Sequence, residues 1–241
     1  MKTCKILTAL LLAAVSMPLM AEGDDFGMWG EVNLEKKINK RWSLDAGLEY
    51  RSRNELKSSD RWSVGLDASF KINDWLKASA GYSLLDDHRH KVNNSGKKYA
   101  DYWGLRHRTN LTLTASKSFG DLNISLRERW QYTYRPEKTV QRYYTADGSE
   151  ADEKTFSSKS KNVWRNRLQL KYKLTSTWRP YLNAETSVSA GLEKIRYAAG
   201  TEIRLSKSQS FDLKYIYQTL YNNDDNESNR HIISAGYTFK F

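Results

Sequence analysis

Charged side chains of the two signs occupy different parts of the chain, and they are the first candidates for chemistry. Carboxylates recur in an early region, while arginines recur at alternate positions further along. Guanidinium groups hold anions through paired hydrogen bonds, and opposed rows of acids and bases create an electric field across a passage. The acidic set is Glu31, Glu35, Asp45, Glu49 and Asp67, and the basic set is Arg106, Arg108, Arg127, Arg129, Arg165 and Arg167.

A second cluster combines carboxylates with imidazoles at Asp86, Asp87, His88 and His90. Such groups together can activate water or bind a metal ion. Their spacing matches no defined motif, and clustered charge is also typical of a solvated surface loop, which is the simpler interpretation. No glycine-rich phosphate loop or metal-ligand spacing occurs in the sequence. We therefore expect no cofactor and no metal, and we assign no catalytic residue.

The N-terminus has the pattern of a secretory signal. Lys2 and Lys5 precede the uncharged apolar stretch 6–15, and small residues lead up to Ala21. This pattern predicts cleavage after Ala21, so that residues 1–21 are a signal peptide and 22–241 are one mature domain. The sole cysteine, Cys4, belongs to the predicted signal, and so the exported domain has no thiol or disulfide chemistry.

The composition excludes two other classes of protein. The net charge of +11 would suit a disordered chain or a nucleic-acid binder, but 12% of the residues are aromatic and only 3 are proline. Disordered chains are poor in aromatic residues and rich in proline. The basic residues alternate with carboxylates, no recognition module is present, and the chain is predicted to be exported, so we expect no nucleic-acid partner.

Apolar residues recur at every second position in successive segments, for example over residues 42–50, 62–72 and 195–205, while the intervening positions are polar. Seven tryptophans lie near segment ends. A soluble β-sandwich also alternates, but strands of about ten residues with aromatic girdles are typical of a transmembrane β-barrel. The sequence therefore predicts an all-β, antiparallel, up-and-down barrel in the outer membrane of a Gram-negative cell.

The pattern contains eleven candidate strands, and we expect 10–12 because bacterial single-chain barrels have even numbers. A first strand that descends to a short turn would run parallel to the last. Either the first segment is not a full wall strand, or there is a further crossing near residues 22–28, or the seam is unusual. Short connections should face the periplasm, and longer ones should face outside. The expected long loops are 54–60, 86–100, 135–159, 191–194 and 222–229.

The chain ends with Tyr237, Phe239 and Phe241 on one apolar face, and this alternation resembles the signal read by the outer-membrane barrel-assembly machinery. Together with residues 26–29, 37–42 and 47–51, this ending is similar to a family of small outer-membrane barrel proteins known only as a domain of unknown function. The resemblance implies a barrel and assigns no catalytic residues. The expected partners are the assembly machinery, periplasmic chaperones, outer-membrane lipid and lipopolysaccharide.

Three polar residues, His107, Glu128 and Asn166, fall on the predicted lipid-facing side. A charged side chain in the apolar band is costly. The carboxylate could mark a lipid-facing active site or a subunit contact, but a β-bulge that turns Glu128 inward toward the neighbouring arginines is the interpretation we favour.

The acidic and basic sets share the polar face, so a closed barrel would carry them on opposite walls of its lumen. They could form a narrow pore, but ten to twelve strands give a backbone radius of only about 10–12 Å, which favours a salt-bridged plug. The expected function is therefore structural or that of a narrow passive pore, with enzymatic activity the less favoured reading. The alternative is a surface or lipid-facing hydrolase acting on lipid or peptide.

Overall fold

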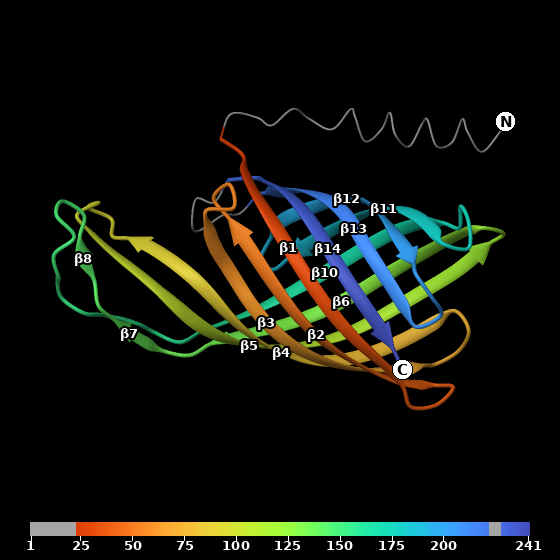
Figure 1. Ribbon diagram of the computed structural model, residues 1–241. Coiled ribbons are helices and arrows are strands. Elements are labelled where there is room, and N and C mark those ends of the chain that lie inside the picture. The colour runs from red at the N-terminus through yellow and green to blue at the C-terminus, as the bar shows by residue number, and fades with distance from the viewer. Residues whose placement is uncertain (1–22, 222–227) are drawn as a thin grey trace.

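The computed structural model describes residues 23–221 and 228–241, so the predicted signal peptide 1–21 lies outside the described residues. The described residues include no helix that is long and apolar enough to cross a membrane. Eleven long strands form a closed barrel (Figure 1). They are β1 (Asp25–Lys37), β2 (Trp42–Arg53), β3 (Ser58–Lys71), β4 (Leu76–Val92), β5 (Lys98–Phe119), β6 (Leu122–Arg135), β10 (Lys159–Tyr172), β11 (Trp178–Val188), β12 (Leu192–Arg204), β13 (Gln209–Leu220) and β14 (Arg230–Lys240).

Ten of the eleven pairings around the barrel join antiparallel neighbours, and the exception is the seam between β1 and β14. These two strands pair in parallel from Asp25 opposite Arg230 to Glu35 opposite Lys240. An up-and-down chain with an odd number of strands must bring its first and last strands together in the same direction. The predicted barrel class and the strand range are confirmed, and the parallel seam follows from the odd count.

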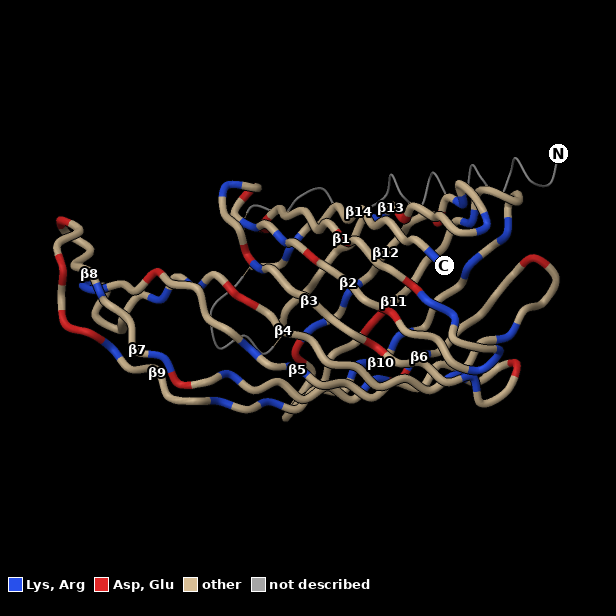
Figure 2. The backbone as a smooth tube through the Cα atoms, turned by 60° about the horizontal axis from the view of Figure 1, so that its bottom comes forward, with Lys and Arg blue, Asp and Glu red and all other residues tan. Residues whose placement is uncertain are grey.

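Strand alternation places apolar side chains on the outside of the barrel. Val64, Leu66 and Leu111 are each more than half exposed, as expected for residues that face a lipid phase rather than a protein core. The inside is mainly polar, and charged positions lie along the strands as well as in the loops (Figure 2). The buried apolar cluster inside the barrel is small and consists of Trp29, Ala198, Ile216 and Ile232.

At one end of the barrel, short turns join neighbouring strands, and polar side chains in these turns accept hydrogen bonds from the backbone. The Asn39 side-chain oxygen accepts hydrogen bonds from the amides of Arg41 and Trp42 at 2.8 and 2.9 Å. Asn73 does the same for Trp75 and Leu76 at 3.0 and 2.8 Å. Local side-chain acceptors of this kind stabilise tight turns. The repeated turn pattern therefore has one physical basis in both hairpins.

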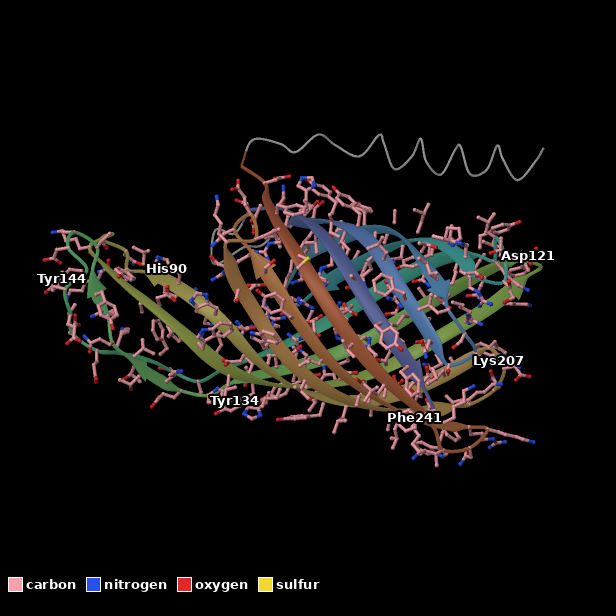
Figure 3. The ribbon with its side chains drawn as sticks, viewed as in Figure 1. His90, Asp121, Tyr134, Tyr144, Lys207 and Phe241 are labelled. Atoms are coloured by element: carbon pink, nitrogen blue, oxygen red, sulfur yellow. The ribbon has the colours of Figure 1, made fainter. Side chains whose placement is uncertain are left out.

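The other end differs from the prediction, because the expected loop 86–100 is mostly strand. β4 and β5 continue as a hairpin well beyond the barrel and turn only at 93–97 (Figure 1). His90 and Tyr144 lie on this extension, far from Asp121 and Lys207 at the short turns (Figure 3). The expected loop 135–159 lies along it and contains the short strands β7 (Lys138–Val140), β8 (Tyr143–Tyr144) and β9 (Lys154–Phe156).

The predicted bulge at Glu128 is wrong. The registers of β6 with β5 and with β10 continue without interruption through this position, where Glu128 lies opposite Leu113 and Asn166. Alternation therefore keeps the carboxylate on the outer face together with Leu126 and Trp130. The Asn166 amide donates to Thr186 Oγ1 at 3.5 Å, so a small polar group accompanies Glu128 on this wall.

Candidate functional site: a basic passage inside the barrel

The interior of the barrel contains two cavities that meet near its middle. The upper cavity, toward the long-loop end, has a volume of about 430 Å³, and the lower cavity, toward the short turns, has a volume of about 370 Å³. Six residues line both cavities, and we refer to them as the partition. They are Trp29, Arg51, Arg108, Gln131, Arg165 and Arg196.

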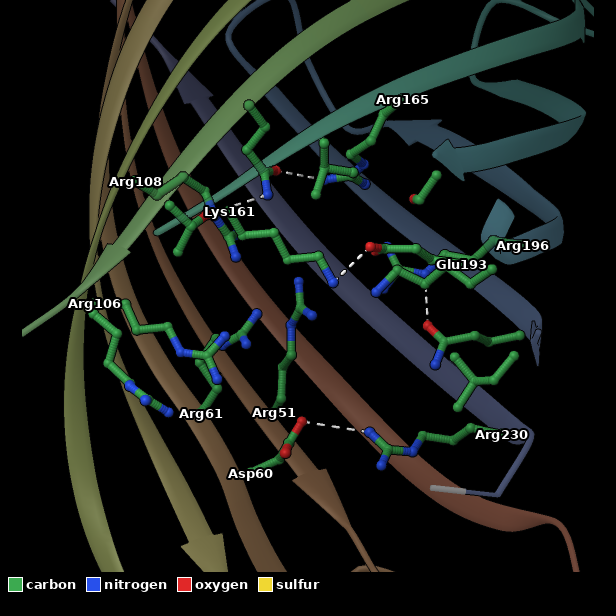
Figure 4. A pocket seen from close by; sticks show the side chains of 18 of the residues that line it. Arg51, Asp60, Arg61, Arg106, Arg108, Lys161, Arg165, Glu193, Arg196 and Arg230 are labelled. Atoms are coloured by element: carbon green, nitrogen blue, oxygen red, sulfur yellow. Dashed lines mark hydrogen bonds and ion pairs between the residues drawn. The ribbon is translucent and has the colours of Figure 1, made fainter. Parts of the chain in front are cut away.

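The two cavities differ in charge balance. Thirteen Lys and Arg side chains line the upper cavity against two carboxylates, Asp60 and Glu193. Eight basic and four acidic side chains line the lower cavity. In Figure 4, the arginines of neighbouring strands point into the upper cavity from its walls. A narrow space lined mainly by one sign of charge attracts ions of the other sign, so the charge of the upper cavity is suited to anions.

The Trp29 side chain occupies the partition. Its ring lies 3.9 Å from the Arg51 guanidinium carbon and 5.0 Å from that of Arg196, and only 5% of the residue is exposed. Cations over an aromatic face are attracted to the ring, which holds all three side chains in place. The sequence interpretation missed Trp29. Its alternation with the outward-facing Met28 could have shown that it points inward.

A second missed residue, Glu185 on β11, is a buried carboxylate that lines the lower cavity. It forms ion pairs with Arg127 and Arg165, and with Arg196 at 3.6 Å. A buried carboxylate needs such partners, because its desolvation is otherwise costly. Glu185 shares the inward face of its strand with Tyr181 and Ser187, but nothing in its local sequence sets it apart.

The predicted acidic set lies on neighbouring strands of one wall. Glu31 is opposite Glu49, and Asp45 is opposite both Glu35 and Asp67, across β1, β2 and β3. Glu31, Glu49 and Asp67 line the lower cavity, whereas Glu35 and Asp45 line neither cavity. Nearby bases bind three of these carboxylates: Arg51 pairs with Glu49 at 2.7 Å, Lys240 with Glu35 at 2.7 Å, and Lys214 with Glu31 at 3.7 Å.

The predicted basic set lies on β5, β6 and β10, across the barrel from the acidic wall in the strand order. Arg127 is directly opposite Arg167, and Arg129 is directly opposite Arg165. Arg106 lines only the upper cavity, Arg127, Arg129 and Arg167 line only the lower one, and Arg108 and Arg165 line both. The ion pairs of these arginines that the structure shows are with Glu185 and Asp87, not with the predicted acidic set.

The cluster of Asp86, Asp87, His88 and His90 is divided between the two faces of β4. The Asp87 carboxylate lies inside, where it contacts Arg61 at 2.5 Å and Arg106 at 2.6 Å. His88 lies outside, pairs with Asp101 and stacks on Trp103 with ring centroids 5.1 Å apart, while alternation puts Asp86 and His90 on this same face. The described part of the chain has no group of three or more potential metal ligands.

The C-terminal aromatic residues lie at the short-turn end of the seam. The Phe241 amide donates to the Glu35 carbonyl at 3.0 Å, so the last residue is still bound to β1. Its ring lies 6.0 Å from that of Phe239, and 59% of the residue is exposed. Tyr237, opposite Val32, continues this outer face.

Residues 26–229 match the model of a family described as a protein of unknown function, DUF2490. The chain belongs to this family. The match covers most of the barrel, from the first residues of β1 to the end of the connection before β14, and so it includes both sides of the partition. No curated protein matches the chain.

The barrel is also similar to solved structures at low sequence identity. The translocator domain of the autotransporter NalP from Neisseria meningitidis has a TM-score of 0.56 and 13% identity, with 90% of each chain covered. The β domain of the Bordetella autotransporter BrkA has a TM-score of 0.53 and 14% identity, covering 83% of this chain and 82% of that one. These similarities show a fold shared with outer-membrane barrels.

Proposed function

We propose that the protein is an integral outer-membrane barrel that forms a narrow pore with a preference for small anions. The barrel fold it shares with the autotransporter domains supports an outer-membrane location. So do the apolar outer face and the predicted secretory signal. Lipid and lipopolysaccharide would then surround the barrel, with the short turns in the periplasm. Periplasmic chaperones and the barrel-assembly machinery would act during biogenesis, the latter on the Phe241 end.

The observation that carries the pore is the pair of cavities that share the partition residues. Together they extend from the long-loop end of the strands to the lower acidic wall. The basic surplus of the upper cavity concentrates anions at the partition, where Arg108 has no carboxylate partner among the described residues. Trp29 narrows the same place, so the conductance should be small.

Planar-bilayer recording of the refolded mature chain tests this function. Under a potassium chloride gradient, the reversal potential should show anion selectivity, because the basic surplus at the partition lies directly on the path. Arg108→Gln should reduce that selectivity, whereas Lys207→Gln, at an exposed short turn, should leave it unchanged. Heat-modifiable migration on a gel confirms that each variant is folded.

Cation selectivity, or an electrically silent membrane that contains folded barrel, would contradict the pore. Silence would favour the second candidate, a purely structural barrel. The filled centre around Trp29 and the ion pairs of Glu185 are the observations that favour it.

A further inference from the structure

The upper cavity holds more positive charge than its surroundings neutralise. Some of its cations have carboxylate partners. Asp87 contacts Arg61, Arg89 and Arg106 at 2.5, 3.7 and 2.6 Å, and Glu193 contacts Lys161 at 2.5 Å. These cations line the cavity and each has a carboxylate partner, although the three arginines share the single Asp87 carboxylate.

Other cations lack such partners within the described residues. Arg108 donates only to Thr133 Oγ1 at 3.4 Å, and Arg135 donates to the Ser157 carbonyl at 2.9 Å. Lys159 at the rim and Lys194 deeper in the cavity have no carboxylate partner in this part of the chain. Four cationic groups, one each on β5, β6, β10 and β12, therefore face the same space without a carboxylate partner among the described residues.

Strand pairing brings like charges together as well. Arg135 lies directly opposite Lys159, and Arg51 lies directly opposite Arg61. Like charges opposed across a strand pair destabilise a sheet. In addition, the buried Nε groups of Arg51, Arg89 and Arg135 have no hydrogen-bond acceptor among residues 23–221 and 228–241. Donors and charges without partners, arranged around one cavity, are the features that a bound anion would complete.

We propose that the upper cavity is a binding site for a soluble polyanion that carries two or more phosphate or carboxylate groups. Arginine forks bind both groups in a bidentate manner, while lysine supplies a point charge. The volume of about 430 Å³ lies in the range of small-molecule sites. Several anionic groups are needed because the uncompensated cations stand on β5, β6, β10 and β12, and one small anion cannot reach all of them. The proposal rests on the proposed function only for the access of solutes from the long-loop end, and it does not require ions to cross the partition.

Isothermal titration of the folded barrel in neutral detergent tests the site, with inorganic tripolyphosphate and citrate as probes and maltotriose as the uncharged control. The anions should bind at one site per barrel, and maltotriose should not. Lys194→Gln and Lys159→Gln should each weaken anion binding about tenfold, the scale of one charge-assisted contact. Lys159 is an exposed residue, so its variant should fold even if the variant at the less exposed Lys194 does not. Lys207→Gln removes the same charge at a short turn and should have no effect.

Equal weakening by Lys207→Gln and Lys194→Gln would show unspecific attraction to a basic protein and would overturn the site. The phosphate groups of a lipid headgroup could bind the same cations as a soluble polyanion. If lipopolysaccharide vesicles titrate the site while tripolyphosphate neither binds nor competes, the proposal of a soluble ligand is wrong. Binding by a barrel that is silent in bilayers would contradict the pore alone, and conduction without binding would contradict this site alone.

Discussion

At the scale of single residues, the sequence predicts on which face of its strand a side chain lies, but it does not predict the ion-pair partner of that side chain. Alternation alone places Arg127 and Arg165 on the polar face of their strands. Their partner Glu185 lies two strands away from Arg127 in the barrel order, so the contact depends on the register and the curvature of the sheet. No local pattern encodes those two quantities, and for this reason the prediction assigned the arginines to a different set of carboxylates.

Glu128 provides a test of side-chain facing. Because its carboxylate lies on the outer wall beside Leu126 and Leu113, replacing it with leucine should leave the stability in lipid unchanged or raise it by about 1–2 kcal/mol. The converse change Leu126→Glu should lower the stability by a similar amount. Urea unfolding in lipid vesicles measures both. A clear loss of stability in Glu128→Leu would show that the carboxylate has partners inside the barrel.

At the scale of elements, period-two alternation predicted the eleven wall strands closely, because each strand has one apolar and one polar face. It failed at the hairpin beyond residue 85. There, charged residues look like a loop in the sequence, but His88, Trp103 and Asp101 stabilise the pairing by stacking and hydrogen bonding. Polar residues can form a strand when cross-strand contacts compensate for the lost apolar face.

The connection between β6 and β10 is held to this hairpin by Asp152. Its carboxylate accepts a hydrogen bond from Lys98 at 2.5 Å and pairs with Arg142, and the Lys98 hydrogen bond and these positive charges lower the Asp152 pKa to about 2 from an ordinary 3.8. A lowered folded-state pKa means that the contact is intact above about pH 4 and is lost as the pH falls toward 2.

Removing the Asp152 carboxylate should therefore break at neutral pH the same contacts that protonation breaks at low pH. In Asp152→Asn, tryptic cleavage after Arg142 should become several-fold faster, because local opening exposes the segment. Glu153→Gln, an exposed neighbour, is the matched control. Equal cleavage rates in the two variants and the wild type would show that Asp152 does not hold the connection in place.

At the scale of the whole molecule, eleven strands with a parallel seam enclose a lumen whose centre is occupied by side chains. The class of barrel could be predicted from the signal pattern, the girdles and the alternation together. The side chains that fill the centre could not be predicted from the sequence, because Trp29 comes from β1 while Arg51 and Arg196 come from β2 and β12. The partition is a property of the closed barrel, since only closure brings these strands around one point.

The most direct test of the account is the single-channel conductance of Trp29→Ala beside that of Trp42→Ala in the same bilayers. Trp29 lies in the partition, whereas Trp42 is 47% exposed at a strand end on the outer face. Removing the indole at the partition should raise the conductance severalfold and preserve anion selectivity, and the change at Trp42 should leave both as in the wild type. Identical conductance in the two variants and the wild type would contradict a passage that is limited at Trp29.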